Sequence, residues 1–86
     1  MSDGRFWADV KVRGEHLRLF SEHNGHGVLV SVYNVNARYR ITPFEAVDNI
    51  EHGKEKAAAY AEAFLQQATN SALPLLKWIK LKCADR

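Results

Sequence analysis

Residues 6–20 read FWADVKVRGEHLRLF, and their two alternating runs predict a pair of antiparallel strands. From Phe6 to Arg13 the apolar residues fall on even positions, while every odd position except Trp7 carries a charge. Because successive side chains of a strand point to opposite faces, this alternation predicts a strand with one buried face. Gly14-Glu15 follows, and a glycine at the first of two central positions is typical of a tight type II′ turn.

A second alternation after the turn predicts the register of a hairpin. With position 13 opposite position 16, Val12 would pair with Leu17 and Val10 with Leu19. All four apolar side chains would then lie on one face, which is what a half-buried antiparallel pair requires. Gly14 should have a positive φ.

Residues 28–41 are rich in residues that favour strands, but the segment is too long for one ordinary strand. Its apolar residues change from even to odd positions partway, which indicates a bulge or a turn near Asn34–Asn36. The sequence leaves one long bulged strand and two short strands as alternatives. Residues 21–27, which precede this segment, predict a polar loop.

Thr42-Pro43-Phe44-Glu45 is the clearest local signal in the chain. The Thr42 hydroxyl can cap a helix, Pro43 suits the first helical position, and Glu45 completes a capping box. Apolar residues spaced three and four apart then predict an amphipathic helix over residues 43–69. Gly53 is the expected weak point, where the helix would kink or break.

The segment from Leu73 onward has no decisive period. Both a strand and a helix are open for residues 75–83, and we favour a strand because a helix would scatter three lysines around its axis. A strand would sort the side chains into two faces, with Ile79, Leu81 and Cys83 on one and Trp78, Lys80 and Lys82 on the other.

These elements predict an α+β protein with a three- or four-stranded antiparallel sheet and one long helix, straight or kinked, on one face. We expect one domain over residues 1–86, with flexible tails at residues 1–5 and 84–86. The expected core draws apolar residues from both layers: Val10, Val12, Leu17, Leu19, Val30, Val32, Ile50, Ala57, Ala61, Phe64 and Leu65.

Composition excludes several classes of protein. An apolar fraction of 47% and a charged fraction of 26% are typical of a globular chain and not of a disordered one. No stretch approaches the ~20 apolar residues of a membrane span, and residues 1–5 precede no apolar signal-peptide segment. The one cysteine, Cys83, cannot form an internal disulfide. We therefore expect a soluble protein of the reducing cytoplasm that does not bind membranes.

No residue pattern indicates catalysis or a metal site. His23 and His26 are three apart, but a zinc site needs three or four ligands, and the others would have to come from elsewhere. The acidic residues between positions 45 and 51 are those expected in the first turns of a helix. None of the five glycines belongs to a phosphate-binding loop. We expect no enzymatic activity, no metal and no cofactor.

The face of the sheet that the helix leaves uncovered is the candidate binding surface. Basic residues interleaved with aromatic residues can neutralise phosphates and stack bases. The same residues could instead form an apolar patch closed by another protein or a second copy, or a plain solvated face. The candidate residues are Trp7, Lys11, Arg13, Arg18, Phe20, Trp78 and Lys80.

Net charge ranks these possibilities. The formal net charge is only +2, whereas dedicated nucleic-acid binders usually carry a larger excess or a dense basic run. We therefore place first a small non-enzymatic protein-interaction or regulatory module that binds a protein partner or forms a homodimer. The alternative is a weak nucleic-acid-binding domain that uses the same basic and aromatic face.

Overall fold

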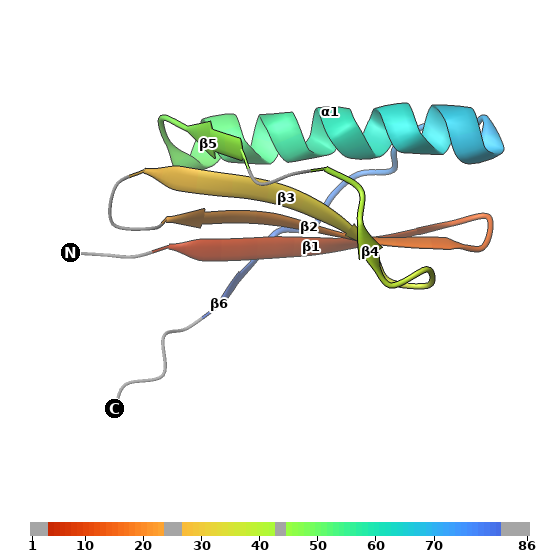
Figure 1. Ribbon diagram of the computed structural model, residues 1–86, viewed down its shortest axis with the longest axis horizontal. Helices are drawn as coiled ribbons and strands as arrows, with labels where there is room; N and C mark the ends of the chain where they lie inside the picture. The colour runs from red at the N-terminus through yellow and green to blue at the C-terminus, as the bar shows by residue number, and fades with distance from the viewer. Residues whose placement is uncertain (1–3, 24–26, 43–44, 82–86) are drawn as a thin grey trace.

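A computed structural model describes residues 4–23, 27–42 and 45–81, and places one helix across one face of an antiparallel sheet (Figure 1). In chain order the elements are β1 (Arg5–Val12), β2 (Glu15–His23), β3 (Val28–Asn34), β4 (Tyr39–Arg40), β5 (Glu45–Val47), α1 (Ile50–Thr69) and β6 (Ile79–Leu81). The predicted α+β class is confirmed, but three or four strands was an undercount, because the sheet has six. The predictions made for His26, Pro43, Lys82, Cys83 and the C-terminal tail concern residues outside this description.

The sheet is built around a meander of β1, β2 and β3. Its strand order is β4-β3-β2-β1-β6, and β5 pairs with β3 as well. β4 pairs with residues 33–34 of β3 and β5 with residues 28–30, so the two short strands share one edge. After the helix the chain returns to the other side of the meander, where β6 pairs with β1 (Figure 1).

The hairpin of β1 and β2 forms, but its turn lies one residue earlier than predicted. Arg13 and Gly14 are the two central residues, with φ of 49° and 84°. Positive φ at both positions is the type I′ arrangement, whose twist matches that of the strands. Val10 pairs with Leu17 and not with Leu19, so the predicted register is wrong by two residues. A shift of two keeps every side chain on its predicted face.

Charge explains why the observed register is preferred. The predicted pairing would have set Lys11 directly opposite Arg18, and like charges in that position destabilise a sheet. In the observed register Arg18 lies opposite Asp9, and its Nε is 2.7 Å from the Asp9 Oδ1. Asn36 also donates from Nδ2 to the carbonyl oxygen of Gly14 at 2.7 Å, which holds the turn in place.

Residues 28–41 form two strands, which settles the alternatives that the sequence left open. β3 ends at Asn34, and residues 35–38 form a turn into β4. The side-chain oxygen of Asn34 accepts a hydrogen bond from the Ala37 N–H at 3.0 Å. The backbone carbonyl oxygen of Asn34 accepts another from the Arg38 N–H at 2.8 Å. The change in apolar parity therefore marks a turn and not a bulge.

The helix begins later than the sequence predicts. α1 starts at Ile50, and the Asn49 side chain caps it by accepting a backbone N–H of the first turn at 2.8 Å. The capping box predicted at Thr42 does not form, because Glu45 lies in β5 and pairs with Val30 of β3. Pairing of residues 45–47 with the edge of β3 is therefore preferred to the helix that the local sequence favours. Thr42 does not cap a helix and is buried.

α1 is continuous from Ile50 to Thr69, so the break expected at Gly53 is wrong. Gly53 instead lets the helix approach the sheet closely. A Cβ at this position would overlap the Ser21 hydroxyl and lie 3.1 Å from the Val28 Cγ1. The same hydroxyl donates a hydrogen bond to the carbonyl oxygen of Ile50 at 3.1 Å, which fixes the first turn of α1 on β2.

The core lies between α1 and the sheet. Most of the predicted core residues are buried there: Val10, Leu17, Leu19, Val30, Val32, Ala57, Ala61 and Leu65. Val12 and Phe64 pack against this cluster while partly exposed, and Ile50 is half-buried at the start of the helix. The prediction missed Ala8 and Val28, which are also buried.

Candidate functional site

Two rows of paired residues cross the sheet on the side opposite α1, which we call the open face. The first row runs through β6, β1, β2 and β3 as Ile79, Trp7, Phe20 and Ser31. The second row runs through β1, β2, β3 and β4 as Asp9, Arg18, Tyr33 and Arg40. Because directly opposite residues have Cβ atoms about 4.5–5.5 Å apart, each row is a line of neighbouring side chains.

The structure brings four of the predicted candidates together on the open face, namely Trp7, Lys11, Arg18 and Phe20. Arg13 lies beyond them in the turn between β1 and β2. Lys11 and Arg13 are exposed, whereas the two aromatic residues and Arg18 are half-buried among their neighbours. The alternation of residues 6–20 was therefore enough to place these side chains on one surface.

Trp78 and Lys80 lie on the helix side, so their expected place on the open face is wrong. β6 forms as favoured, but Ile79 pairs with Trp7 and shares its face, which turns both neighbours away. Trp78 packs against the core. The Nζ of Lys80 lies 5.9 Å from the centroid of the Phe6 ring, which also belongs to the helix side.

Arg18 connects the two rows of the open face. Its Nε and Nη2 donate to the two carboxylate oxygens of Asp9 at 2.7 and 3.1 Å, and its guanidinium carbon lies 5.0 Å from the centroid of the Trp7 ring. The hydrogen bonds from Arg18 lower the pKa of Asp9. The His16 Nε2 lies 3.2 Å from the same carboxylate. The result is a fixed assembly of an aromatic ring, a cation and an anion.

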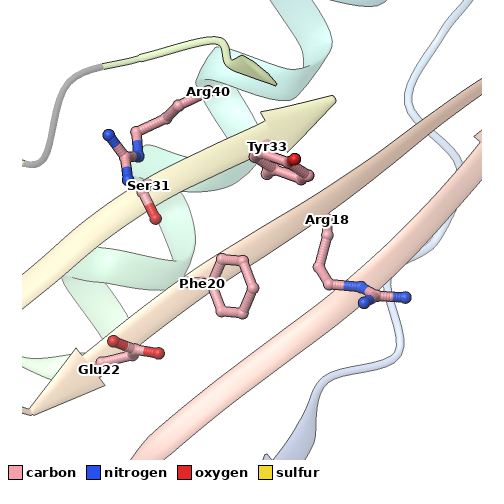
Figure 2. Close-up of a pocket in the computed structure, with 6 residues that line it drawn as sticks. All are labelled: Arg18, Phe20, Glu22, Ser31, Tyr33 and Arg40. Atoms are coloured by element: carbon pink, nitrogen blue, oxygen red, sulfur yellow. The ribbon is translucent and has the colours of Figure 1, made fainter. Parts of the chain in front are cut away.

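A shallow hollow of about 370 Å³ lies beside this assembly (Figure 2). Ser31 is buried to 5% exposure, while the rings of Phe20 and Tyr33 project from neighbouring strands, with Arg40 near Ser31. Arg18 and Glu22 complete the lining. The hollow can therefore take a flat apolar group between aromatic rings, with a cation nearby for an attached anionic group.

Sequence reasoning missed Tyr33, Ser31 and Ile79 as members of this surface. The parity of Tyr33 was visible in the sequence, but its place opposite Arg18 depends on the register between β2 and β3. Four residues separate the end of β2 from the start of β3, too many for a two-residue turn, so no local turn signal fixes this register.

The charge of the chain is divided between its parts, although the total is only +2. Between Arg5 and Arg40, the span that contains β1 to β4, there are six basic and three acidic residues. Between Glu45 and Thr69, the span that contains β5 and α1, there are five acidic and two basic residues. Residues 5–40 therefore carry a net charge of +3 and residues 45–69 a net charge of −3, of which α1 itself, with three acidic and two basic residues, contributes −1.

A second cluster of titratable groups joins β5 to α1. The Tyr60 hydroxyl and the Lys56 Nζ, the latter at 2.9 Å, both contact the Glu45 carboxylate. The hydrogen bond from Tyr60 lowers the pKa of Glu45, and the bond to Glu45 raises the pKa of Tyr60. The contacts fix the short strand against the helix, which is a structural role.

Within residues 4–23, 27–42 and 45–81, no group of three or more His, Cys, Asp or Glu side chains is arranged to hold a metal ion. The helix that the structure describes is not long and apolar enough to cross a membrane. The chain matches no protein-family model, and comparisons with curated proteins and with solved structures found no match either.

Proposed function

We propose that this chain is a non-enzymatic binding module that holds single-stranded nucleic acid on the open face of its sheet. The observation that carries the proposal is the position of Trp7, Phe20 and Tyr33 on three neighbouring strands, with Arg18 and Arg40 beside them. Bases stack on aromatic side chains of exposed sheets, and arginines neutralise the phosphates between them. No cofactor is part of this proposal.

The uneven distribution of charge favours nucleic acid as the ligand more strongly than the net charge of the whole chain does. A total of +2 predicts weak attraction to polyanions, but a strand of nucleic acid on the open face would meet residues 5–40, with a net charge of +3, and not residues 45–69, with a net charge of −3. The same excess disfavours two copies paired face to face, because their positive strands would repel each other.

The expected location is the cytoplasm, where the single cysteine would stay reduced.

Fluorescence anisotropy with a short fluorescein-labelled oligothymidylate tests the proposal. We expect binding at low salt that weakens steeply as salt is added, because each neutralised phosphate releases counterions. Phe20→Leu keeps an apolar side chain but removes the ring, and it should weaken binding by about 1–3 kcal/mol. The matched control is Tyr39→Leu, since Tyr39 is 48% exposed and pairs with Asn34 on the helix side of the sheet.

Absence of binding at low salt would contradict the proposal. Equal losses in Phe20→Leu and Tyr39→Leu would also contradict it, because the open face would then contribute nothing specific. Circular dichroism and thermal unfolding of each variant check that any loss of affinity does not come from unfolding.

A second candidate function is binding of a protein partner or a second copy through the same face. The specific observation in its favour is that Arg18 already lies over the Trp7 ring and is held by Asp9. The Trp7 ring is therefore less accessible for stacking on a base, and Arg18 has fewer free N–H donors for a phosphate. Ile79, paired with Trp7, is 42% exposed and extends the apolar row. Sedimentation of the protein alone tests the second copy: association that persists at high salt and is lost in Trp7→Ala favours self-association through this face.

A further inference from the structure

Two neighbouring turns of the chain each hold an arginine in the left-handed region. Arg13 has φ of 49° in the turn between β1 and β2, and Arg38 has φ of 63° in the turn between β3 and β4. The hydrogen bond from the Asn36 Nδ2 to the carbonyl oxygen of Gly14 joins the two turns directly. Both arginines are exposed, so packing of their side chains does not explain their presence.

The backbone alone would favour other residues at these positions. Left-handed φ is costly for residues that carry a Cβ, and glycine and asparagine adopt it most readily. Asn-Gly is the preferred pair for a type I′ turn, whereas this chain has Arg13-Gly14. Unfavourable backbone conformations that persist in a folded protein point to a function for the side chain.

The cations at this end of the molecule are available to a ligand. Lys11 and Arg13 line a hollow of about 410 Å³ together with their neighbours in the β1–β2 hairpin and with Asn36 from the β3–β4 turn. One acidic residue, Glu15, lines it as well. Within the part of the chain that the structure describes, neither Lys11 nor Arg13 forms an ion pair.

We propose that the two adjoining turns form a phosphate-binding site, in which Arg13, Arg38 and Lys11 contact phosphate groups of a nucleic-acid strand where it leaves the open face. This inference rests on the proposed function for the identity of the ligand, but its chemistry is that of phosphate alone. Guanidinium groups bind phosphate oxygens through paired N–H donors, which explains arginine at positions where asparagine would fit the backbone better.

The test uses Arg13→Asn, Arg38→Asn and the double variant. Asparagine adopts the left-handed conformation of both positions more readily than arginine does, so we expect the melting temperature to stay the same or rise. The affinity for oligothymidylate should fall. In the double variant, the slope of log affinity for oligothymidylate against log salt should decrease by about 1.4, since each lost phosphate contact removes about 0.7. Lys77→Asn, an exposed lysine outside both turns, is the matched control for each single variant.

A second probe, tripolyphosphate, separates this site from the proposed function. In the wild type it should shift the backbone amide resonances of residues 13–14 and 36–38, and in the double variant these shifts should be lost. If oligothymidylate binds with an unchanged salt slope in the double variant, the phosphate site is wrong while the proposed function stands. If only tripolyphosphate binds, and only to the wild type, the site stands and the nucleic-acid function fails. If neither probe binds the wild type, both are wrong.

Discussion

At the scale of single residues, Gly53 sets how closely the helix can approach the sheet. In an exposed helix, glycine is about 1 kcal/mol less favourable than alanine, so Gly53→Ala would stabilise the chain if propensity alone mattered. The added methyl group would instead overlap the Ser21 hydroxyl and press on Val28. Overpacking of this kind typically destabilises by about 1–3 kcal/mol, which exceeds the gain in propensity.

We therefore expect Gly53→Ala to lower the free energy of unfolding, measured by urea denaturation followed by circular dichroism. The variant Ser21→Gly/Gly53→Ala removes the side chain that the methyl group meets, and it should recover part of the loss if the clash is the cause. A higher urea midpoint for Gly53→Ala would mean that the helix moves away from β2 without penalty. The sequence shows the glycine but not its neighbour, so the break predicted there was wrong for a reason that only the packing reveals.

Single residues also show where sequence reasoning reaches its limit on the open face. Alternation placed Trp7, Lys11, Arg18 and Phe20 on one surface correctly, because the side-chain period of a strand is local. It could not predict that Tyr33 lies opposite Arg18, because the register between β2 and β3 depends on the packing of the whole sheet.

At the scale of elements, the start of the helix shows a local signal overridden by tertiary pairing. Residues 42–45 satisfy the capping box, yet the edge of β3 offers unpaired backbone groups to residues 45–47. Forming β5 satisfies those groups, and contacts from Tyr60 and Lys56 to Glu45 hold the new strand. The helix then starts at the next residue suited to capping, Asn49. Propensity is a weak prior against such contacts.

Asn49, and not Thr42, should be the capping residue on which the stability of the helix depends. Asn49→Ala should destabilise the fold by about 1 kcal/mol, because it removes the acceptor for a backbone N–H of the first helical turn. Thr42→Val is the comparison, since it keeps the shape of a buried side chain whose Oγ1 has no hydrogen-bond partner among the described residues. Its urea midpoint should be unchanged or higher. The opposite ranking of the two variants would restore Thr42 as the cap.

At the scale of the whole molecule, the total charge conceals the feature on which the proposed function depends. A sequence count adds all twelve basic and ten acidic residues and so predicts little attraction to polyanions. Counted by segment, residues 5–40 carry a net charge of +3 and residues 45–69 a net charge of −3, and the fold places α1 on the side of the sheet opposite the open face (Figure 1). The fold class followed from periodicity, but this separation required the arrangement of the elements in space.

A variant with an unchanged net charge tests whether the open face or the total charge governs binding. Lys11→Gln/Glu62→Gln removes one exposed cation from the open face and one exposed anion from α1, so the net charge stays at +2. If phosphates contact the open face, its salt slope for oligothymidylate should be smaller than that of the wild type by about 0.7. Glu62→Gln alone should leave the slope unchanged, because a carboxylate on the helix makes no phosphate contact. Slopes that are equal in the wild type and the paired variant would contradict contact between Lys11 and phosphate. A slope that changes in Glu62→Gln alone would place the ligand near α1 and move the binding surface to the other side of the molecule.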